Sequence, residues 1–142
     1  MVTLEEISQL LYGVGEGSAG WQGSQEDLIS LAAKIFPGKA FCVVRQWIFI
    51  DLIMTSEEKE KLSRLGLLPA TLPATLFAHE VVLDSGGRFQ SGMWVRSNFG
   101  VSFIYGCMFE TKNTVYLLSG AGQKKEASVG ADAELTQGPR CH

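Results

Sequence analysis

The fold is decided by residues 76–122, which read LFAHEVVLDSGGRFQSGMWVRSNFGVSFIYGCMFETKNTVYLLSGAG. Runs of β-branched and aromatic residues alternate there with short clusters of Gly, Ser, Asn and Asp, a pattern typical of strands joined by tight turns. We expect four strands, at Leu76–Leu83, Met93–Ser97, Val101–Glu110 and Thr114–Ser119. Apolar residues fall at every second position of the third strand, so one face of the sheet is expected to be covered.

Three helices and one further strand are expected before this stretch. Apolar residues recur at helical spacing in the helices, and each helix starts at a Ser or Thr that can cap its first N–H groups. The helices are expected at residues 3–12, 24–36 and 55–64, and the strand at Phe41–Leu52. The sequence therefore predicts an α+β domain, in which an antiparallel sheet of four to five strands carries two or three helices on one face.

The composition changes toward the C-terminus. Residues 126–142 are mostly polar and lack aromatic side chains, so we expect a single α+β domain over residues 1–125 and a flexible tail at 126–142. Within the domain, residues 69–76 read PATLPATL, a small duplication. Its two prolines oppose regular structure and indicate a linker.

The overall composition restricts the classes of function. The 142 residues carry a net charge of −3, which argues against a broad nucleic-acid-binding surface. The three cysteines have wide spacings and no CxxC pair, which predicts neither structural zinc nor a disulfide framework. No apolar run reaches the roughly 18 residues of a membrane span. We expect a cytoplasmic protein without metal, cofactor or membrane contact, and no catalytic residue is identified.

The hairpin around residues 88–96 carries the candidate partner-binding residues Arg88, Trp94 and Arg96. Arg and Trp are enriched at the energetic centres of protein interfaces. Strand alternation puts Trp94 and Arg96 on the same side, and both are exposed if the helices cover the other side. The alternative is a Trp that packs beneath an Arg side chain at a sheet edge.

The segment from Gly120 to Lys125 is a candidate anion contact. Gly120 and Gly122 follow a strand, and Lys124 and Lys125 come directly after them. A turn of this kind can aim backbone N–H groups at an anion, although the pattern is not that of a P-loop. The alternative is a plain strand exit with solvated lysines.

Two further patterns in the sequence bear on possible chemistry. His79 is most simply structural, and a nucleophilic pair with Cys107 would need a third orienting group and an exposed thiol, whereas burial is expected to raise the pKa of Cys107. Gly15, Gly17 and Gly20 spell GxGxxG, but no strand precedes them and no helix follows directly. We therefore expect a loop there and not a dinucleotide site.

Four segments carry a resemblance to a family of small bacterial proteins. They are DLISLAAKIFP (27–37), FCVVRQWIFIDL (41–52), GRFQSGMWVRS (87–97) and FETKNTVYLLSGAGQKKEAS (109–128). Over about residues 3–128 the chain resembles a domain of unknown function of pseudomonads and their prophages or other mobile elements. The resemblance implies a bacterial cytoplasm, or the host cytoplasm for a phage-encoded protein, and it implies no catalytic residue. The PATL duplication, Met93 and the residues after Ser128 depart from it.

The leading interpretation is a non-enzymatic binding protein. The resemblance favours a phage or mobile-element accessory factor that inhibits a host defence system by protein–protein contact. One alternative is a small-ligand or anion-binding protein, or a small enzyme, that uses the Gly120–Lys125 turn and His79. That alternative requires His79, Arg96 and Lys124 to converge on one pocket. The other is a self-associating structural protein, a homodimer formed through an exposed sheet edge.

Overall fold

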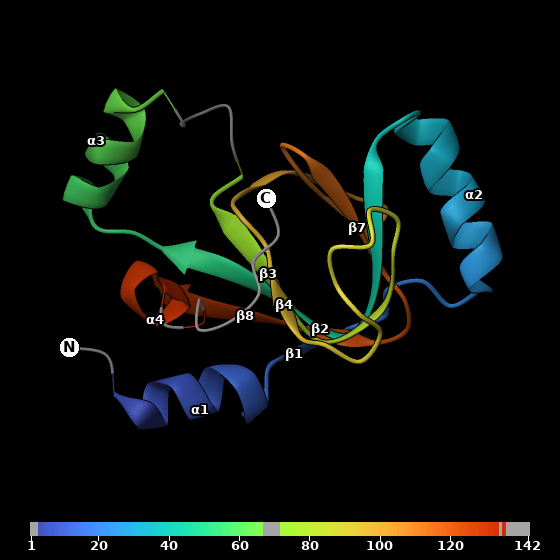
Figure 1. Cartoon of the computed structure of the whole chain (residues 1–142). Coiled ribbons are helices and arrows are strands. Elements are labelled where there is room, and N and C mark those ends of the chain that lie inside the picture. Colours follow the sequence, from blue (N-terminus) through green and yellow to red (C-terminus); the bar gives the residue numbers. More distant parts are fainter. Residues whose placement is uncertain (1–2, 67–71, 134, 136–142) are drawn as a thin grey trace.

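The computed structural model describes residues 3–66, 72–133 and 135, and Figure 1 shows their arrangement. Helices and strands follow one another as α1 (Leu4–Tyr12), β1 (Glu16–Ser18), α2 (Gln25–Ile35), β2 (Ala40–Ile53), α3 (Ser56–Arg64), β3 (Ala74–Asp84), β4 (Val95–Arg96), β5 (Gly100–Ile104), β6 (Met108–Thr111), β7 (Thr114–Leu118), β8 (Gly122–Ser128) and α4 (Val129–Ala133). The three helices expected from the sequence are present, and Thr3, Ser24 and Thr55 cap them.

Strand β2 is the centre of the sheet. Along one edge it is antiparallel to β3, and along the other it is parallel first to β7 and then to β8. Val44 pairs with Leu118 and Ile48 with Gln123, so the β7–β8 side has one residue more than β2 between these pairings. At the same level Gln46 has a φ of 52°, which bends β2. Strands β7 and β8 therefore act as one interrupted strand that follows the bend.

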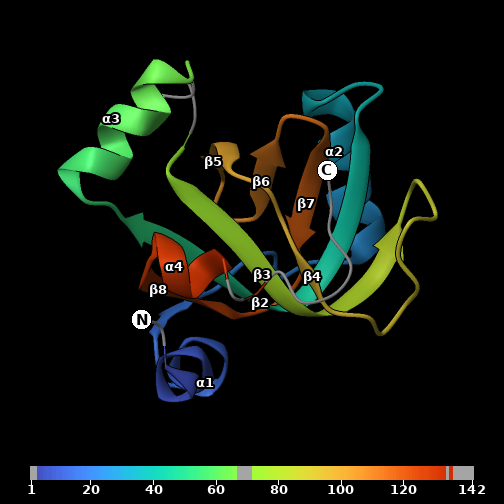
Figure 2. The same cartoon turned by 60° about the vertical axis from the view of Figure 1, so that its left-hand side comes forward.

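The sheet is mixed and larger than expected. Its order is β1-β8-β2-β7-β6-β5, with β3 on the other edge of β2 and β4 beyond β3. The sequence indicated an antiparallel sheet because hairpins leave a local signal, whereas β2 pairs in parallel with segments far along the chain. Figure 2 shows the sheet curling, and a bridge between Leu72 and Gly100 brings β5 to the start of β3.

Three apolar clusters fill the two faces of this curled sheet. The inner cluster lies inside the curl and includes Val44, Trp47, Phe109 and Tyr116. On the outer face, one cluster packs beneath α2 around Leu28. The other outer cluster joins the sheet to α1 and α4, through Leu10, Phe77, Ala127 and Ala131 among others. The helices that bury side chains thus lie on one face, as expected, whereas α3 buries none and projects away (Figures 1 and 2).

The expected strand Val101–Glu110 is wrong, because the structure has a hairpin there. Strands β5 and β6 are joined by residues 105–107, in which the φ angles of Tyr105 and Gly106 are 55° and 66°. Positive φ at both central residues is the geometry of a type I′ turn. The alternation of apolar residues runs on through the turn, which hid it in the sequence. The reversal also places Cys107 in the cluster under α2 and not with Phe103 and Phe109.

The residues after Lys125 differ from the flexible tail that we expected. Residues 126–128 complete β8, and α4 follows directly. Ala127, Ala131 and Leu135 are buried, and so is Asp132, which is only 1% exposed. Alanines and an aspartate give little apolar signal in the sequence, so the packing of this segment was not predicted. The rest of the expected tail, residues 134 and 136–142, lies outside the described residues, as do residues 67–71, which include the start of the PATL duplication.

Candidate functional site

Arg88 is bound within the molecule. Its guanidinium contacts both carboxylate oxygens of Asp84, at 3.0 and 3.3 Å, and donates to the hydroxyl of Thr114 at 3.2 Å. Burial alone would raise the pKa of Asp84, but hydrogen bonds from Arg88 and its charge outweigh burial and hold that pKa below its ordinary value. The arrangement ties the end of β3 to β7.

Trp94 and Arg96 lie on the side of the sheet that faces α4. Arg96 forms an ion pair with Asp132 of α4, and Asp132 also accepts a 2.6 Å hydrogen bond from the buried hydroxyl of Thr75. The Arg96 side chain is therefore only 13% exposed, which corrects the expectation that Trp94 and Arg96 are exposed together. Trp94 is half-buried and its ring stacks on Phe77 at 5.6 Å. Burial of the C-terminal residues is the reason for the difference.

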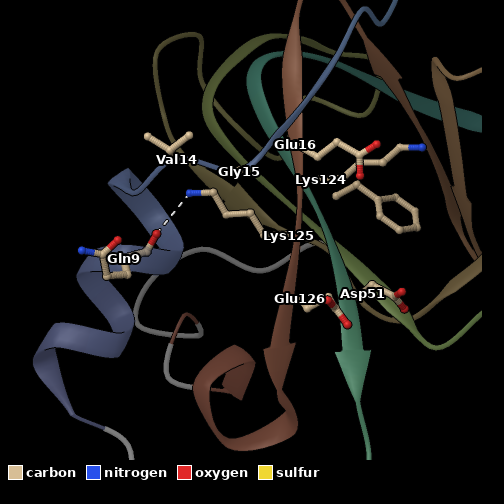
Figure 3. A pocket seen from close by; sticks show the side chains of 9 residues that line it. Gln9, Val14, Gly15, Glu16, Asp51, Lys124, Lys125 and Glu126 are labelled. Carbon is tan, nitrogen blue, oxygen red and sulfur yellow. Dashed lines mark hydrogen bonds between the residues drawn. The ribbon is translucent and has the colours of Figure 1, made fainter.

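The structure does not assemble Gly120, Gly122, Lys124 and Lys125 into an anion site. The N–H group of Gly120 donates to the carbonyl of Trp21 at 2.8 Å, and its own carbonyl accepts from the Trp47 indole at 2.9 Å. Gly122 lies against the Trp47 ring. Lys124 and Lys125 point to opposite sides of β8, as Figure 3 shows.

Lys125 holds the C-terminal end of α1. Its ammonium donates to the carbonyls of Gln9, Leu10 and Gly13, at 3.1, 2.8 and 2.6 Å. Burial lowers the pKa of Lys125. Three carbonyls saturate the three donors of an ammonium group, so this lysine is a helix cap and not an anion ligand.

A cavity of about 590 Å³ lies beside Lys125, between β1, β8 and the second half of β2 (Figure 3). Glu16, Asp51 and Glu126 line it together with Lys124. The ammonium of Lys124 lies 5.6 Å from the centre of the Phe103 ring. Acidic side chains outnumber the available lysine there, which does not favour an anion.

His79 and Cys107 lie in different parts of the fold. Cys107 is 2% exposed beneath α2, and burial raises the pKa of its thiol, as the sequence predicted. His79 lines two cavities, Lys124 lines a different one, and Arg96 lines none of these three. His79, Arg96 and Lys124 therefore do not converge on one pocket, and the geometry does not favour a site built from them.

The first cavity at His79 is an aromatic chamber of about 400 Å³ between α1, β3 and the residue preceding β4. It is lined by Ile7, Leu11, Tyr12, Phe77, His79, Trp94 and Leu135. The rings that line it contact one another. The ring of Tyr12 stacks on that of His79 with 5.4 Å between their centres, and the ring of Phe77 meets that of His79 edge-on at 5.0 Å. Such distances are those of favourable aromatic pairs.

The second cavity at His79 is a polar chamber of about 290 Å³ at the bend of β2. It is lined by Leu11, Gln46, Trp47, Ile48, His79, Ala121, Gly122 and Gln123. Leu11 and His79 line both chambers, so the two adjoin, and we call them together the His79 cleft. No Asp, Glu, Lys or Arg side chain is among the described residues that line it.

Residues 18–133 match the family model described as a domain of unknown function, DUF6957. The chain belongs to this family. No curated protein and no solved structure matches the chain. The family assignment confirms the expected domain of unknown function. The DUF6957 match extends to residue 133, past the point where the resemblance was expected to end.

The DUF6957 match includes Phe77, His79 and Trp94 but begins after α1. The aromatic chamber therefore has one wall inside the family domain and another, with Tyr12, before it.

Among the described helices, none is long and apolar enough to span a membrane. Within the same residues, no three His, Cys, Asp or Glu side chains gather as a metal site.

Sequence reasoning singled out Trp94 and His79 but not their surroundings. Tyr12 ends the helix predicted at residues 3–12, and Gln46 falls within the strand predicted at Phe41–Leu52. Their meeting at His79 depends on how α1 docks and where β2 bends. A weak signal was present: Tyr12 continues the helical stripe of Leu4, Ile7 and Leu11 into a neighbouring position.

Proposed function

We propose that this protein acts by binding another protein, without catalysis, and that the aromatic chamber under α1 is the contact surface. The observation that carries the proposal is the cluster of Tyr12, Phe77 and Trp94 around an open cavity. Tyr12 remains 75% exposed. Exposed aromatic rings beside a hydrophobic cavity are the features that anchor partner side chains.

The surface next to the chamber adds apolar area. Leu4 is 90% exposed and lies on the same face of α1 as Ile7 and Leu11, which both line the chamber. Exposed apolar side chains beside an open apolar cavity are typical of binding surfaces.

The wider setting of the proposal rests on the resemblance to proteins of pseudomonads and their prophages. It supports the proposal of an accessory factor that acts in a bacterial cytoplasm, or in that of an infected host, and inhibits a host defence protein by occupying its surface. The net charge of −3 is compatible with a partner that has a basic, nucleic-acid-binding surface.

Affinity capture with matched variants tests the contact surface. Tyr12 and Tyr105 are equally exposed, at 75% and 76%, but Tyr105 lies at the β5–β6 turn, away from the chamber. We expect Tyr12→Asn to weaken partner binding by roughly 30-fold, about 2 kcal/mol, as at other interface centres, and Tyr105→Asn to leave it unchanged. The measurement is the yield of each captured host protein, quantified by mass spectrometry.

Two outcomes would contradict the proposal. One is equal yield of every captured protein with the two variants. The other is a homodimer, detected by light scattering, that Tyr12→Asn dissociates and Tyr105→Asn preserves, since that result would assign the chamber to self-association.

A further inference from the structure

We infer that the His79 cleft binds an uncharged peptide segment with one tryptophan or tyrosine, whose ring enters the aromatic chamber while its backbone lies in the polar chamber. The inference rests on the proposed function and names the chemistry that the partner presents. It comes from three properties of the described lining residues: the geometry of their rings, the accepting Nδ1 of His79, and the absence of charged side chains among them.

The walls of the aromatic chamber are suited to a flat ring. Phe77 and Trp94 lie within 24° of parallel, Tyr12 and His79 within 27°, and Phe77 meets His79 at 80°. A guest ring can therefore stack on one pair and present its edge to the other, the two arrangements that aromatic groups prefer. The volume of about 400 Å³ lies within the range of cavities that hold small organic groups.

His79 favours a ring that can donate a hydrogen bond. Its Nε2 lies 3.1 Å from the carbonyl oxygen of Leu11. That oxygen can only accept, so Nε2 carries the hydrogen, and Nδ1 of the neutral ring is an acceptor. Nδ1 makes no hydrogen bond with the described residues. An indole N–H or a phenol O–H can supply this bond, and phenylalanine and leucine cannot.

The polar chamber offers amide groups to a peptide backbone. Gln46 is exposed and Gln123 half-buried, and each side-chain amide has a donor and an acceptor, as a peptide group does. Gln46 keeps a left-handed φ of 52° at the bend of β2, between Arg45 and Trp47, which both pair with β3. Non-glycine residues held in this conformation occur preferentially at ligand-binding positions.

The absence of charged residues among the described lining residues limits the occupant further. An ionic group placed there would lose hydration without gaining a counter-charge. Residues 136–142 of this chain read TQGPRCH, which contains an arginine and neither Trp nor Tyr, so their chemistry does not match the cleft. A neutral aromatic segment of a separate protein fits better than this segment.

The test uses four capped amino acids and the full ¹⁵N-labelled chain. We expect N-acetyl-tryptophanamide and N-acetyl-tyrosinamide to shift the NMR signals of Tyr12, His79 and Trp94. We expect them to bind at least fivefold more tightly than N-acetyl-phenylalaninamide, which lacks the donor, and N-acetyl-lysinamide not to bind. In His79→Phe, which keeps a ring but removes Nδ1, the tryptophan and phenylalanine probes should bind equally.

Equal affinity of the tryptophan and phenylalanine probes for the unchanged protein would overturn the inference, and so would tighter binding of the lysine probe or no shift at the cleft. This comparison stands even if His79→Phe fails to fold. A failure here, together with partner capture that still depends on Tyr12, would leave the protein-binding proposal intact and reject only the peptide chemistry.

Discussion

Among the described residues, two that are not glycine have a positive φ, a backbone conformation that the β-carbon disfavours. Gln46 and Tyr105 have φ angles of 52° and 55°, in a region that costs an L-residue about 1–2 kcal/mol. Gln46 lies at the bend of β2 and lines the polar chamber. Tyr105 is 76% exposed at the tip of the β5–β6 hairpin. The strain at Gln46 coincides with a cavity, whereas the strain at Tyr105 serves only the turn.

Replacing Tyr105 with asparagine should therefore stabilise the protein. Asn tolerates the left-handed conformation, and Asn-Gly is the favoured pair of a type I′ turn. We expect Tyr105→Asn to raise the free energy of unfolding by about 0.5–1 kcal/mol in urea titrations. Tyr105→Ala is the control, because alanine keeps the unfavourable φ. Equal stability of the two variants would show that turn conformation does not limit stability here.

At the scale of elements, α1 is attached to the domain mainly by its C-terminal end. It buries only Leu10, and it has no basic residue in its own last turn. Lys125 supplies the positive charge to the carbonyls there, and His79 approaches the carbonyl of Leu11. Because α1 forms one wall of the aromatic chamber, the attachment also shapes the candidate site.

Removing the ammonium of Lys125 should loosen α1 without unfolding the sheet. Lys125→Met keeps the length of the side chain but leaves the carbonyls of Gln9, Leu10 and Gly13 without this donor. We expect amide hydrogen exchange across α1 to accelerate about tenfold, or 1.4 kcal/mol, in line with the loss of a charged hydrogen bond. Lys124→Met is the matched control, since Lys124 points away from α1 (Figure 3). Similar exchange in both variants would contradict the capping role.

The sequence was sufficient for elements whose signals are local. Caps at Thr3, Ser24 and Thr55 predicted three helices, and an apolar run predicted the strand that became β2. The polar strands β1 and β8 were missed, because what stabilises them is pairing with distant segments. Trp94 was recognised as a candidate, but the ion pair of Arg96 with Asp132 was not, because α4 carries almost no apolar pattern.

At the scale of the whole molecule, two ion pairs close the same end of the curled sheet. Asp84 pairs with Arg88, which reaches Thr114, and Lys39 contacts Glu110 at 2.6 Å. Burial would raise the pKa of Glu110, but hydrogen bonds from Lys39 and Ser102 and the charge of Lys39 lower it overall. Both carboxylates thus have lowered pKa values in the folded protein.

The lowered pKa values of Asp84 and Glu110 predict that the protein loses stability in acid. A carboxylate whose pKa is lower when folded contributes its full stability above its unfolded pKa, and loses it as the pH falls through the folded value. We expect the free energy of unfolding to decline below about pH 5, measured by urea titration across pH 2–7. The Asp84→Asn/Glu110→Gln double variant should decline less steeply. An unchanged slope in the variant would assign acid sensitivity to other groups.

Strand β2 lies between β3 on one edge and the interrupted strand β7–β8 on the other. This position governs the order in which the sheet can assemble during synthesis. The antiparallel partner β3 leaves the ribosome soon after β2, but the parallel partners end only at Ser128. Before β7 and β8 are made, this edge of an apolar strand has no partner, and unpaired edges invite aggregation. Parallel pairings between distant segments also form slowly. Strands β7 and β8, which are made well after β2, are therefore the segments that protect this edge of the central strand.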